Sequence, residues 1–210
     1  MKHLIIIGVG VFGDIVREYA VLSKAYEKEW DIKGFLYGDN DLEEDIKLRN
    51  PIAHYTDYSI EEDDVFICSY IDNFDRSEVY RVMNEKNAEF INVIHPSANI
   101  FHSVSLGKGN VIGAFTTLSA NVSIGNMNII QDHCNLGHDS VIGNYNHLFV
   151  GSVLCGKNKV SDQVSIFTGS LIYPQIRLGM SSQVAAGSVV MRNVKEGLIV
   201  MGNPAKRMDK

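Results

Sequence analysis

The clearest pattern in the chain is an aliphatic residue at every sixth position from 94 to 190. All seventeen of these positions hold Ile, Leu or Val. If about a quarter of residues were of this type, chance would give such a run on the order of once in ten billion trials. The members are Ile94, Ile100, Leu106, Ile112, Leu118, Ile124, Ile130, Leu136, Ile142, Leu148, Leu154, Val160, Ile166, Ile172, Leu178, Val184 and Val190.

Two further columns accompany the aliphatic one. The residue four places after each aliphatic position is mostly small, from Ala98 to Ser188. The residue directly after it is often glycine, which permits a turn conformation closed to residues with a Cβ. These glycines are Gly107, Gly113, Gly125, Gly137, Gly143 and Gly179. Each hexapeptide therefore predicts one short strand followed by one turn.

Three such hexapeptides are expected to close one triangular coil. The aliphatic residue points into the prism, the small residue fills a corner, and stacked coils pair as parallel strands about 4.8 Å apart. The uninterrupted repeat makes a little over five coils, so we expect no long loop to leave the prism. A right-handed β-solenoid or a β-sandwich is the alternative, and the strict period disfavours both.

The first ninety residues show a different pattern, in which short apolar runs alternate with helical periodicity. We predict a small parallel α/β domain, about half of a dinucleotide-binding fold. The expected domains are 1–92 and 93–210, with His95-Pro96 marking the turn between them. The predicted strands are 4–7, 32–36, 65–69 and 90–94, and the predicted helices are 14–28 and 74–88.

A GxGxxG motif, with Gly8, Gly10 and Gly13, follows the first predicted strand. Glycines there let the backbone approach a phosphate at a helix N-terminus. We favour a nucleotide-sugar site, with Asp39 after the second strand as a further substrate contact. An NAD site is disfavoured because ninety residues are too few for a full dinucleotide fold. A tight strand-to-helix turn without any ligand remains an alternative.

Charge is distributed unevenly along the chain. Residues 1–90 carry 10 Lys+Arg and 20 Asp+Glu, whereas residues 91–210 carry 9 and 5. A mildly basic C-terminal part suits a polyanionic small molecule and is too weakly basic for nucleic acid. The cysteines Cys68, Cys134 and Cys155 are too few for a disulfide framework or a zinc site. With no signal-peptide pattern and no unbroken apolar span, we expect a cytoplasmic protein.

The segment from Gly137 to His147 carries the sharpest motif in the chain. It reads as a His138-Asp139 pair, then Ile-Gly, then an aromatic residue and a second histidine. The segment Gly202-Asn203-Pro204-Ala205 follows the solenoid. Together with the N-terminal GxGxxG domain, this combination resembles hexapeptide-repeat sugar acetyltransferases. That family includes sialic acid O-acetyltransferases and N-acetyltransferases of nucleotide-linked 4-amino-sugars. The chain departs from its pattern at Tyr37-Gly38-Asp39, where an acidic pair is common, and at 148–151, which lacks a proline.

The resemblance implies a half-Rossmann α/β domain followed by a left-handed parallel β-helix. It also implies acetyl-CoA-dependent N-acetylation of a nucleotide-linked amino sugar, for bacterial surface glycans such as lipopolysaccharide or capsule. Sugar O-acetylation is the alternative activity. The family forms trimers with active sites between subunits, so we expect a homotrimer.

The chemistry of acyl transfer selects the candidate site residues. A general base near neutral pKa must take a proton from the acceptor, which suits His138, and Asp139 could orient its imidazole. Gly156 stacks one coil above His138, where its N–H could stabilise the oxyanion. His147 could hold the substrate or a water. We expect coenzyme A along the C-terminal coils, with contacts at Gly156, Lys157, Arg177, Ala186 and Lys206.

Two other classes of protein fit the sequence less well. Carbonic anhydrases of the γ class share the solenoid and bind zinc through three histidines, but the position that would complete a triad with His133 and His138 is Ser97. We therefore expect no metal site. An ice-binding solenoid needs a threonine-rich face, and the solenoid has only Thr116, Thr117 and Thr168. Cys155, beside Gly156, is interpreted as a packing residue.

Overall fold

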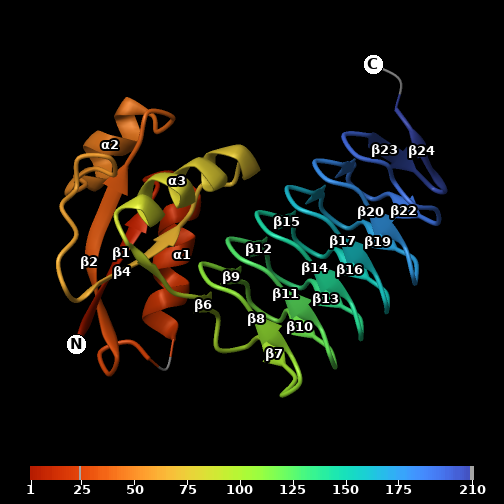
Figure 1. Cartoon of the computed structure of the whole chain (residues 1–210), viewed down its shortest axis with the longest axis horizontal. Helices are drawn as coiled ribbons and strands as arrows, with labels where there is room; N and C mark the ends of the chain where they lie inside the picture. Colours follow the sequence, from red (N-terminus) through yellow and green to blue (C-terminus); the bar gives the residue numbers. More distant parts are fainter. Residues whose placement is uncertain (24, 209–210) are drawn as a thin grey trace. The chain divides into compact units, whose positions relative to one another are not determined.

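The computed structural model describes residues 1–23 and 25–208. Internal contacts divide the chain into two compact units, Met1–Pro96 and Ser97–Lys210, which Figure 1 colours along the sequence. The predicted helix at 14–28 includes residue 24, and the predicted C-terminal domain includes residues 209–210. These three positions lie outside the described residues. No helix among the described residues is long and apolar enough to cross a membrane.

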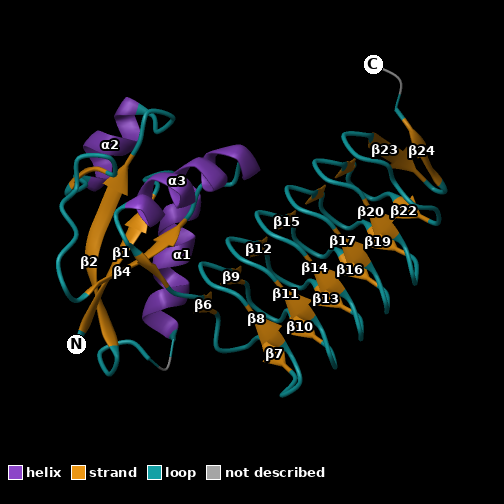
Figure 2. Ribbon diagram, in the orientation of Figure 1, coloured by secondary structure: helices purple, strands orange, loops and turns teal. Residues whose placement is uncertain are grey.

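The N-terminal unit is built on a parallel sheet with strand order β3-β2-β1-β4-β5. The chain first extends the sheet on one side of β1 and then crosses to the other side. A topological switch point, where open α/β sheets bind ligands, therefore lies between the carboxyl ends of β1 and β4. The elements, drawn in Figure 2, are β1 (Lys2–Ile7), α1 (Val11–Leu22), β2 (Trp30–Tyr37), α2 (Glu43–Arg49), β3 (Ala53–His54), β4 (Asp64–Cys68), α3 (Asn73–Glu85) and β5 (Glu89–Phe90).

The elements of this unit differ from the sequence prediction in several places, and the two-residue strand β3 was not predicted. Helix α1 starts directly after Gly10 and ends at Leu22, because Ser23 adopts an extended backbone. Helix α2 was not predicted, since it buries none of its residues and so shows no apolar periodicity. The predicted strand at 90–94 is divided between β5 and β6 (Val93–Ile94).

The C-terminal unit is a prism of three parallel sheets, whose coils are stacked from green to blue in Figure 1. From β6 to β22, strands pair with those three hexapeptides away, as predicted; Leu136, for example, pairs with Leu118 and Leu154. The first sheet has the order β22-β19-β16-β13-β10-β7, the second β20-β17-β14-β11-β8, and the third β24-β23-β21-β18-β15-β12-β9-β6.

The strands of the prism are two residues long up to β22, after which a short antiparallel hairpin, β23 and β24, closes the described chain. Their bounds are β7 (Asn99–Ile100), β8 (Ser105–Leu106), β9 (Val111–Ile112), β10 (Thr117–Leu118), β11 (Ser123–Ile124), β12 (Ile129–Ile130), β13 (Asn135–Leu136), β14 (Val141–Ile142), β15 (His147–Leu148), β16 (Val153–Leu154), β17 (Lys159–Val160), β18 (Ser165–Ile166), β19 (Leu171–Ile172), β20 (Arg177–Leu178), β21 (Gln183–Val184), β22 (Val189–Val190), β23 (Ile199–Gly202) and β24 (Ala205–Arg207).

The aliphatic column forms the core of the prism. Every member from Ile112 to Val190 is at most 4% exposed. Ile94, Ile100 and Leu106 are only partly buried, because they belong to the first coil of the stack. At one corner, Asn110, Asn128 and Asn146 form a ladder in which each side-chain oxygen accepts the N–H of the matching residue in the next coil, at 2.7–2.9 Å. The period-six pattern thus specifies both the core and a corner in which the asparagine oxygens are hydrogen-bonded from coil to coil.

Glycine follows the aliphatic positions for a different physical reason from the one expected. None of them has a positive φ; the left-handed residue lies two places further on and is mostly not glycine, as at Phe115 and Asp139. Instead, a Cβ on Gly137 would lie 2.6 Å from backbone atoms of the next coil. Glycine is required there because adjacent coils approach too closely for a side chain.

Truncation of one core residue tests this packing. Leu136→Ala is expected to lower the free energy of unfolding by about 2–5 kcal/mol, because Leu136 is fully buried and the prism cannot collapse around the cavity. Urea denaturation followed by circular dichroism measures the change. The control is Val141→Ala, on the next strand, where the side chain is 48% exposed and little should change. Equal stability of the two variants would contradict the assignment of the core.

Candidate active site

The turn after β13 presents an exposed histidine–aspartate pair. Nδ1 of His138 lies 2.8 Å from Oδ2 of Asp139, and the two side chains are 57% and 42% exposed. Asp139 has a φ of +59°, and its N–H donates to the carbonyl of Ala120 in the preceding coil. The hydrogen bonds from His138 and then Asn121 hold the pKa of Asp139 below its usual range. An ionised Asp139 accepting from Nδ1–H leaves the lone pair on Nε2, which is the form required of a general base.

Gly156 lies against this imidazole, as the spacing of the repeat predicted. A Cβ built on Gly156 would stand 2.6 Å from Nε2 of His138, so this nitrogen faces a position of the next coil that has no side chain. The N–H of Lys157 donates to the carbonyl of His138 at 2.7 Å, which fixes the register of the two turns. The N–H of Gly156 donates to no described residue. It is therefore available to an oxyanion formed beside Nε2.

Asn121 is a third member of this site, in contact with the His138–Asp139 pair, and it was not predicted from the sequence. Its Nδ2 donates to Oδ1 of Asp139 at 3.0 Å, and its own N–H donates to Oγ of Ser103. Asn121 therefore restrains the carboxylate oxygen that His138 does not contact. The signal was present in the repeat, since Asn121 stands three hexapeptides before Asp139 and so stacks directly on it.

His147 has different surroundings from His138. Its side chain is 0% exposed and stacks on Phe149 with a centroid separation of 3.7 Å. Its role in holding the substrate or a water stays a prediction. His133 is exposed and stacks on Phe115. Among the described residues, no group of three or more His, Cys, Asp or Glu side chains is arranged to hold a metal ion.

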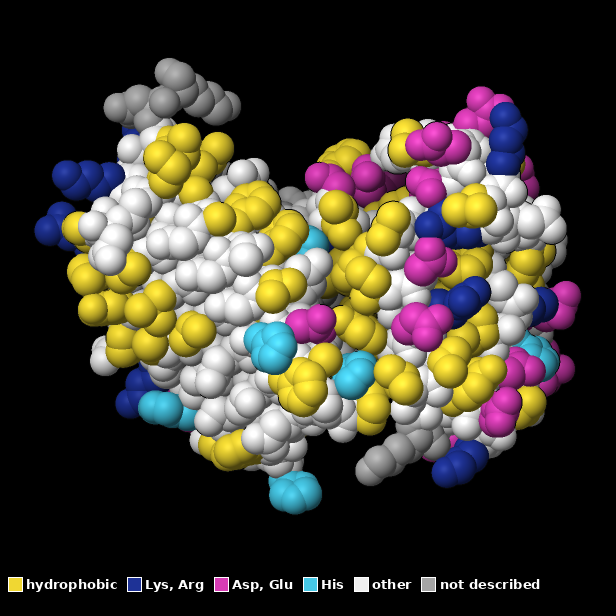
Figure 3. Space-filling model, turned by 180° about the vertical axis from the view of Figure 1, so that it is seen from behind, with side chains coloured by type: hydrophobic (Ala, Val, Ile, Leu, Met, Phe, Trp, Pro, Cys, Tyr) yellow, Lys and Arg dark blue, Asp and Glu magenta, His cyan; other side chains and the backbone are white. Residues whose placement is uncertain are grey.

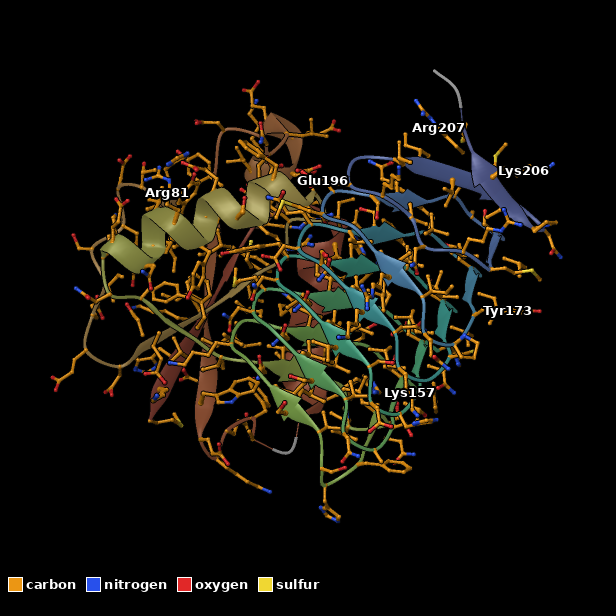
Figure 4. The ribbon with its side chains drawn as sticks, turned by 45° about the vertical axis from the view of Figure 1, so that its right-hand side comes forward. Arg81, Lys157, Tyr173, Glu196, Lys206 and Arg207 are labelled. Carbon is orange, nitrogen blue, oxygen red and sulfur yellow. The ribbon has the colours of Figure 1, made fainter. Side chains whose placement is uncertain are left out.

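The residues predicted to contact coenzyme A are exposed along the later coils. Lys157, Arg177, Ala186 and Lys206 are all exposed, and Gly156 is partly so. In the view of Figure 4, Lys157, Tyr173 and Lys206 follow one edge of the solenoid toward its C-terminal end. A cavity of about 420 Å³ lies at that end, and its basic lining residues are Arg192, Lys195, Lys206 and Arg207. Basic side chains therefore lie next to the His138 turn, at Lys157, and around the cavity at the C-terminal end of the solenoid.

Part of the glycine motif of the N-terminal unit lines a second cavity, of about 320 Å³, at the switch point of the sheet. Gly8 and Gly10 both line it, and a side chain on Gly10 would meet nothing within 4 Å. Gly13 does not line it; a Cβ there would lie 2.5 Å from the carbonyl oxygen of Gly8, so its role is to let α1 pack on the β1 turn. Two of the three glycines are therefore positioned to approach a ligand.

Asp41, rather than Asp39, makes the hydrogen bonds that connect the loops after β1, β2 and β4. Its Oδ1 accepts from the N–H of Val9 at 3.1 Å, and its Oδ2 accepts from the N–H of Gly38 and the hydroxyl of Tyr70 at 2.9 and 2.5 Å. Burial, followed by this hydrogen bond, raises the pKa of Tyr70, so its hydroxyl remains a donor. Asp39 is exposed and lines an adjoining cavity of about 160 Å³. Its assignment as a substrate contact stays a prediction.

A half-Rossmann unit followed by a hexapeptide β-helix with an exposed His-Asp pair defines the architecture of the hexapeptide-repeat sugar acetyltransferases. No protein-family model and no curated protein sequence matches the chain. Solved structures do match it over its whole length.

Three of these structures are informative. PerB from Caulobacter crescentus, in complex with CoA and GDP-perosamine, matches with a TM-score of 0.87 and 25% identity, over 100% of this chain and 98% of that chain. The acetyltransferase domain of PglB from Neisseria gonorrhoeae, in complex with acetyl coenzyme A, matches with a TM-score of 0.87 and 22% identity, over 99% of both chains. WeeI from Acinetobacter baumannii matches with a TM-score of 0.79 and 22% identity, over 99% of this chain and 100% of that chain.

These matches confirm the left-handed β-helix and the half-Rossmann unit before it. They also confirm the predicted resemblance to the acetyltransferases of nucleotide-linked amino sugars.

Proposed function

We propose that the chain transfers the acetyl group of acetyl-CoA to the amine of a nucleotide-linked sugar. The observation that carries this proposal is the exposed His138–Asp139 pair, whose free Nε2 faces Gly156. The whole-length similarity to PerB, solved with CoA and GDP-perosamine, supports the same two substrates. The basic cavity at the end of the later coils suits the phosphates of coenzyme A, and the cavity beside Gly8 and Gly10 suits part of the nucleotide.

The residues of the pair account for the proton movements of this reaction. The neutral amine attacks the thioester carbonyl while Nε2 of His138 takes a proton from the amine nitrogen. The N–H of Gly156 stabilises the oxyanion of the tetrahedral intermediate. The carbon–sulfur bond then breaks, and the imidazolium returns the proton to the departing thiolate. Asp139 keeps the imidazole in the required tautomer throughout.

The test is an assay of free thiol release from acetyl-CoA in the presence of nucleotide-linked amino sugars. We expect release that depends on the sugar, together with a product that has gained one acetyl group by mass spectrometry. Hydroxylamine treatment distinguishes the two acceptor types, because it removes an acetyl ester and leaves an amide. Removal of the acetyl group would point to O-acetylation, and no sugar-dependent release would remove the proposal.

Asn121 gives a prediction on how the pair is held. Asn121→Ala should lower kcat roughly 2–10-fold at unchanged KM, because one hydrogen bond to Asp139 is lost. Asn121→Asp adds a second carboxylate beside Asp139. The added negative charge favours the protonated imidazole of His138, although the positive charge of Lys157 nearby opposes this effect. The acidic limb of the pH profile of kcat/KM should therefore shift to higher pH.

The matched control is Asn126→Asp, which makes the same change of charge in another turn and keeps an acceptor for the N–H of Lys108. Its pH profile should match that of the unmodified protein. An Asn121→Asp profile with no shift would show that Asn121 does not act through the pair.

We also propose that the chain is a homotrimer with His138 near a subunit interface. The solenoid leaves large apolar side chains exposed, among them Phe101 at 44%, Phe115 at 62% and Val141 at 48%, and such side chains favour association. Light scattering at micromolar concentration should give three times the chain mass of 23.4 kDa. A monomeric mass would contradict the proposal.

Cytoplasmic localisation and a role in surface glycan synthesis, as in lipopolysaccharide or capsule, belong to the same proposal. The three cysteines are free thiols, which suits a reducing compartment. A nucleotide-linked acetamido sugar is an activated glycosyl donor, so a glycosyltransferase would consume the product.

A further inference from the structure

Two cavities of the N-terminal unit adjoin each other at the carboxyl ends of β1, β2 and β4. They share the lining residues Asn40, Tyr70 and Asp75. Among the described residues that line them there is neither Lys nor Arg. The acidic lining residues are Asp39, Asp41, Asp72, Asp75 and Glu78. Such cavities repel the diphosphate of a nucleotide and favour a ligand rich in N–H or O–H donors.

The glycine loop leads to the same conclusion. One backbone donor of this loop, the N–H of Val9, already donates to Asp41 of the chain itself and is not available to a phosphate. The adjoining cavity is lined instead by the rings of Tyr55, Tyr70 and Phe74, and Phe74 is 70% exposed. Aromatic side chains of this kind stack on nucleobases. The end of the nucleotide that fits these cavities is therefore the base.

Asp75 provides the acceptor that can distinguish one base from another. Its Oδ1 accepts from Nδ2 of Asn40 at 2.8 Å, and its Oδ2 accepts from no described residue. Burial and then the neighbouring Asp72 raise its pKa, so a ligand that donates hydrogen bonds would stabilise its charged form. Guanine presents two adjacent donors, N1–H and the 2-amino group, to one carboxylate. Uracil and thymine present one N–H between two carbonyl oxygens, which these carboxylates repel, and adenine and cytosine place a ring acceptor beside their amino group.

We propose that the base bound in these cavities is guanine, with Asp75 accepting from N1–H and the 2-amino group and Asn40 donating to O6. The inference rests on the proposed function and specifies its substrate as a guanosine-diphosphate-linked amino sugar. PerB, which has 25% identity to this chain, was solved with such a substrate.

The experiment measures binding of free nucleoside diphosphates to the full chain by titration calorimetry, without acetyl-CoA. GDP should bind at least ~10-fold more tightly than UDP, dTDP or CDP, since a bidentate contact discriminates between bases by about that factor or more. Asp75→Asn should weaken GDP binding roughly 10–100-fold. The same variant should gain affinity for xanthosine diphosphate, whose 2-carbonyl accepts from an amide, and misfolding cannot produce such a gain.

The control is Glu85→Gln, which removes the same charge from the same helix, α3, and lines neither cavity. It should bind GDP like the unmodified protein. Equal or tighter binding of UDP would overturn the guanine assignment, and acetylation of a UDP-linked amino sugar would then leave the proposed function intact. Unchanged GDP binding by Asp75→Asn would overturn the role of Asp75. Binding of none of the nucleotides, with no thiol release from any nucleotide sugar, would overturn both.

Discussion

His138→Ala is expected to lower kcat by roughly 10²–10⁴, the range measured for loss of a general base. The side chain is 57% exposed and makes one side-chain hydrogen bond, to Asp139, so its removal should leave the coil intact. Acetyl-CoA should still bind, because its predicted contacts lie on the later coils. Steady-state kinetics together with calorimetric titration of acetyl-CoA separate the two effects.

The control for this variant is His102→Ala. His102 occupies the same place in the repeat two coils earlier and is also exposed, yet the residue that follows it is Ser103 rather than a carboxylate. Its loss should change kcat little. Full activity of His138→Ala would remove the central mechanistic claim, and an equal loss in both variants would point to a structural role for this column of residues.

Gly156→Ala is expected to lower kcat/KM for acetyl-CoA by roughly 10²-fold. The added Cβ would stand 2.6 Å from Nε2 of His138, so the ring must rotate away from the position where the thioester is attacked. A displacement of about 1 Å at a reacting group costs a factor of this size. The kinetic signature is a loss of kcat/KM with unchanged stability of the solenoid.

Gly169→Ala is the matched control, because a Cβ on Gly169 meets nothing within 4 Å. Its φ of +68° means that alanine there costs backbone strain, on the order of 1 kcal/mol of stability, without touching the His138 turn. Activity close to normal is expected. If Gly156→Ala were as active as Gly169→Ala, the short distance between Gly156 and His138 would not affect catalysis.

The solenoid was predictable to the residue because one constraint acts at every coil. An aliphatic side chain must enter the prism once in each hexapeptide, and Leu136 therefore pairs with Leu118 and Leu154 as the spacing requires. The N-terminal unit was predicted in outline only. Helix α2 buries no residue, and β3 is two residues long, so neither leaves an apolar pattern to detect.

The candidate site shows the same contrast. The proximity of His138 and Gly156 follows from their separation by three hexapeptides, and the contact of Asn121 with Asp139 could have been found in the same way. The hydrogen bonds of Asp41 and the position of Asp75 in the cavities could not have been predicted from the sequence. Both depend on how the loops after β1, β2 and β4 meet at one sheet edge. Figure 3 shows the Asp and Glu side chains on its face gathered mainly over the N-terminal unit, yet a charge count does not reveal which of them line a cavity.

Because the coils stack at a constant spacing, the number of coils between two residues of the solenoid fixes the distance between them. Leu136, before the His138 turn, and Val190, before the last basic turn, lie in the same sheet and are separated by three coils. At about 4.8 Å per coil this separation is on the order of 14 Å. Because each coil touches only its two neighbours, gain or loss of a whole coil changes this length in fixed steps without disturbing the register elsewhere. The distance between the His138 turn and the last basic turn can therefore change by insertion or deletion of whole coils. Such a change would suit a longer or shorter acyl carrier and leave the His138 turn unaltered.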